Sequence, residues 1–291
     1  MTTATILAEG LHFGEGPRWH EGKLWFSDFY DHTIKTVDEA GIVTTVLRVN
    51  GQSSGLGWLP DGRLLYVSML DRKLMRLEPD GIPVVHADLS GIATWHCNDM
   101  VVDAVGRAYV GNFGFNLEEA MAAGGPAAVL AEHPLADMAR VDPDGSVQVA
   151  ATGLHFPNGA VITPDGRTMI LAETLAARLT AFDIAEDGSL SNQRVWAGLG
   201  TRVPDGICLD EAGRVWAANA LGPEVVCVAE GGVVVAVVGT SQPCFACMLG
   251  GADGRTLFCL TAAGSGEDVA AATRTGRIEV ARVESPRAGR P

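Results

Sequence analysis

The sequence has little positive charge and no long, unbroken hydrophobic run. Its 21 lysine and arginine residues face 35 aspartate and glutamate residues, which gives a formal net charge of −14. Such an excess repels a phosphate backbone, so we expect no nucleic-acid partner and a charge that serves solubility. The most apolar stretch, residues 225–238, is interrupted by Glu230-Gly231-Gly232 and is too broken to span a membrane. No membrane association is therefore expected.

The chain also lacks the marks of an exported or redox-active protein. Residues 1–9 contain neither a basic segment nor a long apolar core, so no signal peptide is predicted. The six cysteines fall mostly in predicted strands. Cys244 and Cys247 have Cys-x-x-Cys spacing, but no second pair and no strand–helix context accompany them. We expect free thiols in a cytoplasmic protein.

What the sequence does have is a hairpin that recurs six times. Each copy is an apolar strand, a turn closed by glycine and a second strand, and five of the turns end in a Gly-Arg pair. Successive turn glycines lie 40, 44, 60, 47 and 41 residues apart. This period fits four short strands per unit. The sequence therefore predicts an all-β, six-bladed β-propeller with four antiparallel strands per blade.

Two places depart from the repeat, within what we interpret as a single domain of residues 1–291. The last unit is one strand short, and the N-terminal residues 3–8 are expected to close this blade, because closing the ring removes two exposed edges. The longest spacing reflects an insertion at about residues 112–138. Its Ala-rich stretch, residues 117–123, predicts a short helical lid, with a packed surface loop as the alternative. The tail, residues 284–291, is expected to be loose.

Equivalent positions at the start of each unit's first strand should form a ring at one mouth of the channel. Counting back eight residues from the turn glycine gives this position in units two to six. Aligning Trp19 with Trp58 gives it in unit one, whose turn is shorter. The ring residues are Glu15, Ser54, Asn98, Asn158, Asp205 and Ala246. The alternative is that the Asn-Gly and Asp-Gly pairs here are simply turn formers.

A divalent cation suits such a ring. Facing carboxylates and carboxamides are costly to desolvate unless something binds them, and two carboxylates match the charge of the cation. No ring position holds His or Cys. This favours Ca²⁺ or Mg²⁺ over Zn²⁺, and the open geometry leaves Zn²⁺ and Mn²⁺ as alternatives. We predict one divalent metal ion, with Ca²⁺ first.

Four motifs around the ring, in order along residues 11–261, resemble the SMP-30/gluconolactonase/regucalcin family of six-bladed propellers. The motifs are Gly14-Glu15-Gly16-Pro17, Asn98-Asp99, Pro157-Asn158-Gly159 and Pro204-Asp205-Gly206. The resemblance implies that Glu15, Asn158 and Asp205 hold a catalytic divalent metal. It also implies that Asn98 contacts the substrate or a metal-bound water, and that the protein, like many members of that family, hydrolyses lactones with Ca²⁺, Zn²⁺ or a related ion.

We therefore predict a metal-dependent, gluconolactonase-like lactonase acting on a small-molecule lactone. The cation would polarise the carbonyl, Asp205 would be the general base, and Asn98 would orient the carbonyl or the water. Asp99 is assigned to support. Alternatives are hydration, dehydration or isomerisation of a sugar-acid derivative at the same metal, and a non-catalytic calcium-binding propeller. A scaffold of the WD40 kind would carry Gly-His and Trp-Asp marks, which this chain lacks.

The substrate-binding candidates depart from the family. Two residues before the Asn98 position, members that use sugar lactones often carry an arginine. Here His96 stands there, after Trp95, which puts a sugar-acid lactone in doubt. His96 is a candidate proton donor or substrate hydrogen-bonder, with an ordinary loop-edge histidine as the alternative. Phe113, Phe115 and Asn116 begin the insertion, and an aromatic lid favours a less polar lactone or ester. The sequence assigns no oligomeric state.

Overall fold

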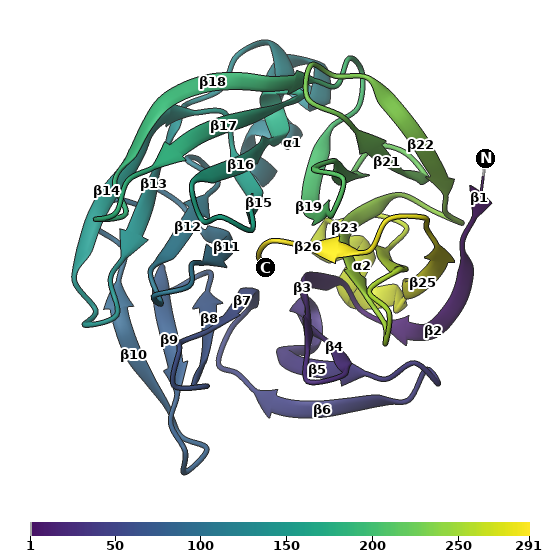
Figure 1. Ribbon diagram of the computed structural model, residues 1–291, viewed down its shortest axis with the longest axis horizontal. Helices are drawn as coiled ribbons and strands as arrows, with labels where there is room; N and C mark the ends of the chain where they lie inside the picture. The colour runs from purple at the N-terminus through teal and green to yellow at the C-terminus, as the bar shows by residue number, and fades with distance from the viewer. Residues whose placement is uncertain (1) are drawn as a thin grey trace.

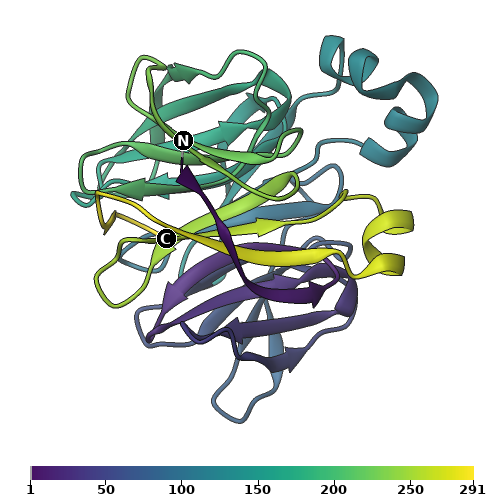
Figure 2. The same cartoon turned by 90° about the vertical axis from the view of Figure 1, so that its right-hand side faces the viewer.

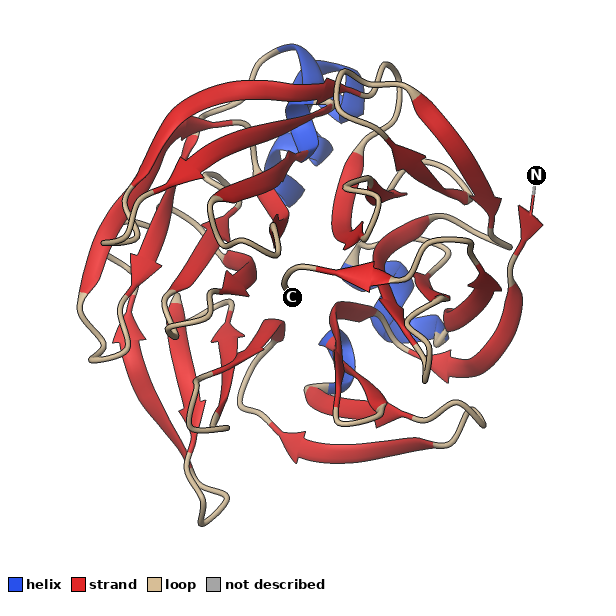
Figure 3. Ribbon diagram, viewed as in Figure 1, coloured by secondary structure: helices blue, strands red, loops and turns tan. Residues whose placement is uncertain are grey.

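Each recurring hairpin of the sequence forms the two inner strands of a sheet. In the computed structural model, which describes residues 2–291, six sheets stand around a central axis, with the strands of each blade running outward in antiparallel order (Figure 1 and Figure 3). The innermost strands are β3 (Gly14–His20), β7 (Ser53–Trp58), β11 (Cys97–Val102), β15 (Pro157–Ile162), β19 (Pro204–Asp210) and β23 (Cys244–Gly250). The predicted six-bladed propeller is confirmed.

The remaining strands follow in three layers. The second strands are β4 (Lys23–Asp28), β8 (Leu64–Ser68), β12 (Ala108–Asn112), β16 (Thr168–Glu173), β20 (Val215–Asn219) and β24 (Thr256–Thr261). The third strands are β5 (Thr33–Val37), β9 (Lys73–Leu77), β13 (Ala136–Val141), β17 (Arg178–Ile184), β21 (Glu224–Val228) and β25 (Gly276–Arg282). The outermost strands are β6 (Val43–Arg48), β10 (Pro83–Asp88), β14 (Val147–Leu154), β18 (Leu190–Gly198), β22 (Val234–Gly239) and β2 (Thr5–Leu11).

Burial falls from the axis outward. All residues of β11, β15, β19 and β23 are buried, whereas β6 has no buried residue and β22 has one. The hydrophobic core therefore lies between the faces of neighbouring blades; one cluster joins Phe26, Trp216 and Phe258 from three blades. Innermost strands covered on both faces read as continuous apolar runs, which is why the repeat is visible in the sequence.

The N-terminal segment closes the ring as predicted. β2 pairs antiparallel with β25, from Thr5 opposite Val280 to Leu11 opposite Gly276, and so supplies the fourth strand of the last blade. The preceding β1 (Thr2–Thr3) continues onto the next blade, where it pairs in parallel with β22. One N-terminal segment thus ties two neighbouring blades together.

The C-terminal tail is not loose, so that expectation was wrong. β26 (Arg287–Ala288) pairs with β19, and Ile162 and Arg290 exchange two backbone hydrogen bonds of 2.8 Å. The tail crosses the axis, where Figure 1 shows the C-terminus over the centre of the ring. The cause is the free inner edge of the innermost strands, whose unpaired backbone groups the tail satisfies.

The helices lie at the opposite end of the channel. In the side view of Figure 2 both α1 (Leu117–Ala131) and α2 (Glu267–Thr273) project from one face, and the C-terminal tail lies on the other. α1 follows β12 and is longer than the Ala-rich stretch alone indicated. It kinks at Gly125, which has a φ of 72° and directly precedes Pro126. Within residues 2–291 no helix is both long and apolar enough to cross a membrane.

Candidate functional site

The predicted ring residues all lie at the start of an innermost strand, at the channel mouth on the side of α1 and α2, which we call the helix mouth. Glu15, Asn98, Asn158 and Asp205 are 5–9% exposed. Their interactions show that they converge: the Ser54 hydroxyl donates to Asn98 Oδ1 at 3.4 Å, and the Asp205 carboxylate interacts with both Glu15 and Asn158. Ala246 completes the ring as a buried apolar residue.

Glycines explain why the ring is narrow. A glycine follows the ring residue in four of the six innermost strands. A Cβ on Gly206 would lie 2.7 Å from Ala246 Cα, and one on Gly16 would lie 2.6 Å from the Ser54 carbonyl oxygen. Neighbouring strands therefore touch backbone to backbone at this level. The Asn-Gly and Asp-Gly pairs lie inside strands, so the turn-former reading was wrong.

Burial and neighbouring negative charge disfavour the ionised form of both ring carboxylates. Burial raises the pKa of Glu15 well above its usual range, and the charges of Asp205 and Asp99 raise it further. Burial and the Asp99 charge likewise raise the pKa of Asp205, partly offset by the Asn158 side chain. None of the ion pairs within residues 2–291 involves Glu15 or Asp205. A bound cation would relieve this repulsion.

Asp99 faces a different partner. Its Oδ1 atom lies 2.7 Å from an Arg18 guanidinium nitrogen, and both side chains are at most 6% exposed. Arg18 also donates to the backbone carbonyls of Pro17, Leu56 and Met100. The positive charge nearest the ring is thus used within the channel wall, where it joins the first three blades. This geometry is consistent with a supporting role for Asp99.

The donor set of the ring fits a hard divalent cation. Two carboxylates supply the charge, and Asn158 donates its Nδ2 to Thr174 Oγ1 at 3.1 Å, which leaves its Oδ1 atom for a ligand. Across the described residues no three His, Cys, Asp or Glu side chains form a metal-binding group. A metal held here would therefore depend on amide oxygen, as Ca²⁺ and Mg²⁺ readily accept.

Aromatic side chains form a row beside the ring. Trp95 stacks on His96 with ring centroids 4.9 Å apart, His96 lies 6.2 Å from Phe113, and Phe113 lies 4.5 Å from Phe156. Burial lowers the pKa of His96, which keeps its imidazole neutral at neutral pH. Sequence reasoning missed Phe156, although it directly precedes the Pro157-Asn158 motif.

A second group of side chains joins α1 to the propeller. Phe115 stacks on His133 at 6.2 Å, and His133 Nε2 lies 2.9 Å from His155 Nδ1. His133 Nδ1 lies 2.8 Å from the Val129 carbonyl and must donate to it, so in the neutral pair His155 donates to His133. His133 was also missed; a lone histidine after an Ala-rich helix gives no spacing signal.

Asn116 differs from the other predicted substrate residues in having its side chain engaged locally. Its Oδ1 accepts the Glu119 backbone N–H at 3.2 Å, and its Nδ2 donates to the Glu119 carboxylate at 3.2 Å. This reciprocal pair caps the N-terminus of α1. Asn116 therefore fixes where the helix begins, while Phe113 and Phe115 make the aromatic contacts.

Known proteins share this architecture over nearly the whole chain. The pentonolactonase XacC of Haloferax volcanii is 27% identical over 279 residues, which cover 92% of this chain and 87% of that protein. Human regucalcin is 26% identical over 236 residues, covering 76% and 73%.

Solved structures agree on the fold. Regucalcin from Agrobacterium tumefaciens, described as a calcium-binding protein, has a TM-score of 0.80 at 20% identity, covering 100% of this chain and 97% of that chain. A gluconolactonase from Xanthomonas campestris has a TM-score of 0.74 at 23% identity, covering 96% and 88%. The family model for the SMP-30/Gluconolactonase/LRE-like region matches residues 13–263. The chain therefore belongs to the SMP-30/gluconolactonase/LRE-like family, as its four ring motifs indicated.

Proposed function

We propose that the protein is a metal-dependent lactonase whose active site is the helix mouth. The observation that carries this proposal is the pair of buried carboxylates, Glu15 and Asp205, that repel each other and form no ion pair within residues 2–291. Its family includes a pentonolactonase and a gluconolactonase, which supports ester-ring opening over other chemistry. We assign Glu15, Asn158 and Asp205 as the ligands of one divalent ion, with Ca²⁺ first and Zn²⁺, Mn²⁺ and Mg²⁺ as the alternatives.

When bound, such an ion supplies a Lewis acid that stabilises negative charge on the carbonyl oxygen. Asp205 accepts a proton from the attacking water, whose oxygen bonds to the carbonyl carbon. The C–O ester bond of the lactone then breaks, and Asp205 returns the proton to the leaving alkoxide to give a hydroxy acid. Asn98 orients the carbonyl: because its Oδ1 accepts from Ser54, its Nδ2 is the donor left for the substrate.

The aromatic row sets the substrate class. Trp95, Phe113 and Phe156 present rings around His96, and Phe115 stacks on His133 under α1. Flat apolar surfaces of this kind favour a lactone with an apolar ring or chain over a fully hydroxylated one. His96, neutral at working pH, accepts or donates one hydrogen bond to that substrate.

The test is pH-stat hydrolysis of a panel running from sugar γ- and δ-lactones to aliphatic and aromatic lactones. The protein is first stripped with EDTA and then supplied with one ion at a time. We expect activity to vanish with EDTA, to return best with Ca²⁺, and to be highest on the less polar lactones. If sugar lactones proved the best substrates, the assigned role of the aromatic row would be refuted, but the proposed lactonase activity would not. No hydrolysis of any lactone with any ion would refute the lactonase.

A further inference from the structure

The opposite end of the channel holds a cavity of about 820 Å³. It is lined by the ends of β3, β7, β11 and β15 and by the C-terminal tail, so we call it the tail-mouth cavity. Four residues along an innermost strand, from Ser54 to Trp58 for example, separate the two ends by about 13 Å. Its volume is that of a site for a small organic ligand.

Two arginines of the tail, Arg287 and Arg290, line this cavity. Among residues 2–291, neither Arg287 nor Arg290 forms an ion pair with a carboxylate. Burial lowers the pKa of the Arg287 guanidinium, and the positive charge of Arg290 adds to that lowering. In a chain with a net charge of −14, two neighbouring uncompensated guanidinium groups are an exception that a bound anion would resolve.

The acidic side chains of the lining are already used or point outward. Asp103 accepts from Arg107 Nε at 2.6 Å and from the backbone N–H groups of Val105 and Arg107. Glu21 is highly exposed and lies 3.9 Å from His20. Neither therefore neutralises the tail arginines.

The tail holds its arginines in place through its backbone. Arg287 N–H donates to the Gly254 carbonyl at 2.9 Å, and Arg290 exchanges two backbone bonds with Ile162. The arginines are thus presented by a pinned strand, so a ligand need not order the tail in order to bind. Among the described residues the Arg287 side chain makes one long hydrogen bond of 3.4 Å, to the Trp19 carbonyl, so its other N–H groups can donate to a ligand.

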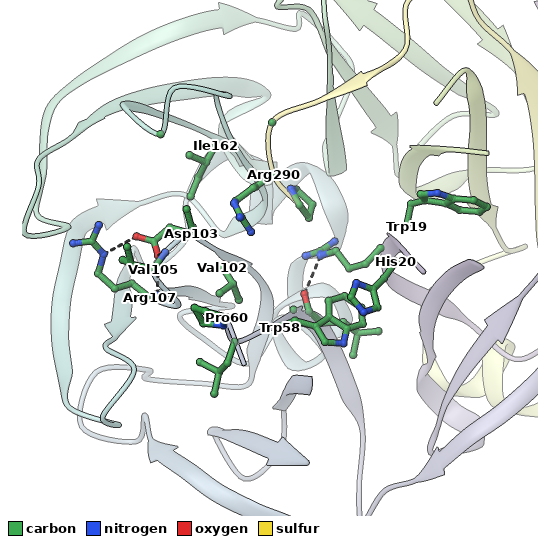
Figure 4. A pocket seen from close by; sticks show the side chains of 18 of the residues that line it. Trp19, His20, Trp58, Pro60, Val102, Asp103, Val105, Arg107, Ile162 and Arg290 are labelled. Atoms are coloured by element: carbon green, nitrogen blue, oxygen red, sulfur yellow. Dashed lines mark hydrogen bonds and ion pairs between the residues drawn. The ribbon is translucent and has the colours of Figure 1, made fainter. Parts of the chain in front are cut away.

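An aromatic wall faces the tail. His20 stacks on Trp58 with ring centroids 3.9 Å apart and an interplanar angle of 14°, and Trp25 supports Trp58 edge-on at 5.5 Å. Figure 4 shows Arg290 between this wall on one side and Asp103 and Arg107 on the other. The cavity therefore offers two guanidinium groups that can donate hydrogen bonds to an anion, and one flat apolar surface.

We propose that the tail-mouth cavity binds a small organic anion, with its carboxylate or phosphate held by Arg287 and Arg290 and its apolar part against Trp58 and His20. Bidentate guanidinium groups recognise both kinds of anion, so the test separates the two. This proposal does not depend on the proposed lactonase activity, because it concerns residues at the other end of the channel.

Isothermal titration calorimetry with inorganic phosphate, phenyl phosphate and benzoate tests this site. We expect saturable binding of at least one of the phenyl anions, tighter than that of inorganic phosphate, and the stronger of the two identifies the anion class. Arg290→Gln should weaken binding about tenfold or more, since it removes a charge-assisted hydrogen bond. Trp58→Leu should remove the preference for the phenyl group. Arg282→Gln is the matched control, because that exposed arginine pairs with Asp253 away from the cavity.

Two results would overturn the proposal. One is the absence of saturable binding by all three anions at millimolar concentration. The other is equal binding by the Arg290→Gln variant and the control, with both folded by circular dichroism. Lactone hydrolysis measured on the same variants should stay unchanged, since neither arginine lies at the helix mouth.

Discussion

The two ends of one channel carry opposite, unmatched charges. At the helix mouth the buried carboxylates of Glu15 and Asp205 form no ion pair within residues 2–291; at the tail mouth the guanidinium groups of Arg287 and Arg290 likewise form none. Between the two ends Arg18 and Asp99 form a buried pair of 2.7 Å. Removing one partner of a buried ion pair destabilises the fold, whereas buried ionisable groups without a partner at a mouth mark a candidate binding site.

The sharpest test of the helix mouth is Asp205→Asn. This nearly isosteric change removes the base and one ligand charge, so we expect kcat/KM for lactone hydrolysis to fall by about 10²–10⁴-fold. The fold should persist, because one of two repelling carboxylates is gone. Asp183→Asn, on the surface in β17, is the matched control and should keep full activity. Comparable losses in the two variants would contradict the assignment of Asp205.

Breaking the Arg18–Asp99 pair between the two ends should lower the stability of the fold strongly. Either Arg18→Met or Asp99→Leu leaves an uncompensated buried charge, so each should lower the free energy of unfolding by about 3–5 kcal/mol in urea titrations. The double variant should recover much of this loss, since both charges are then removed. Strictly additive losses would mean that the two side chains contribute independently and that the pair does not join the blades.

A calcium titration followed by thermal unfolding compares the two mouths directly. Ion binding to the folded state alone stabilises by about 2.7 kcal/mol when the free ion is 100 times its Kd. We expect Ca²⁺ to raise the Tm of the wild-type protein, not to raise that of Glu15→Gln, and to act fully on Arg290→Gln. A Tm rise that persists in Glu15→Gln would place the ion elsewhere.

The smallest effect is expected where His133 and His155 join α1 to the propeller at the helix mouth. Burial lowers the pKa of His155, so the docked state takes up a proton less readily than an undocked one. Docking should therefore be stable above the ordinary histidine pKa of about 6.5 and should weaken as the pH falls below it, by about 1 kcal/mol for the His133–His155 hydrogen bond. Hydrogen-exchange protection factors of residues 117–131 at about pH 5.5 and about pH 7.5 measure this. His133→Phe should remove the pH dependence, and His86→Phe, in β10, should not.

The repeated blades could be predicted from the sequence, whereas contacts between residues far apart in the sequence could not. The repeat of turn glycines predicted six blades. One count from these glycines placed Asn158 and Asp205, and the alignment of Trp19 with Trp58 placed Glu15, at the same mouth. Arg18 and Asp99 lie 81 residues apart in different blades, and no repeat relates them. The tail binds through backbone groups of β19, for which any sequence would serve, so composition suggested a loose end.

Two departures from the glycine pattern were visible, but their partners were not predicted. Where four blades place glycine after the ring residue, the third places Asp99 and the sixth places Cys247. In the structure Asp99 faces Arg18 and forms a buried ion pair with it. A break in a repeat at a fixed register position is thus a signal for a specific partner.

The pairing of β2 with β25 imposes an order on biosynthesis. Residues 5–11 are translated well before their partner, residues 276–282. Until residues 276–282 have left the ribosome, the segment of residues 5–11 has no native strand to join, and the last blade stays incomplete. Closure of the ring therefore follows the synthesis of the other five blades.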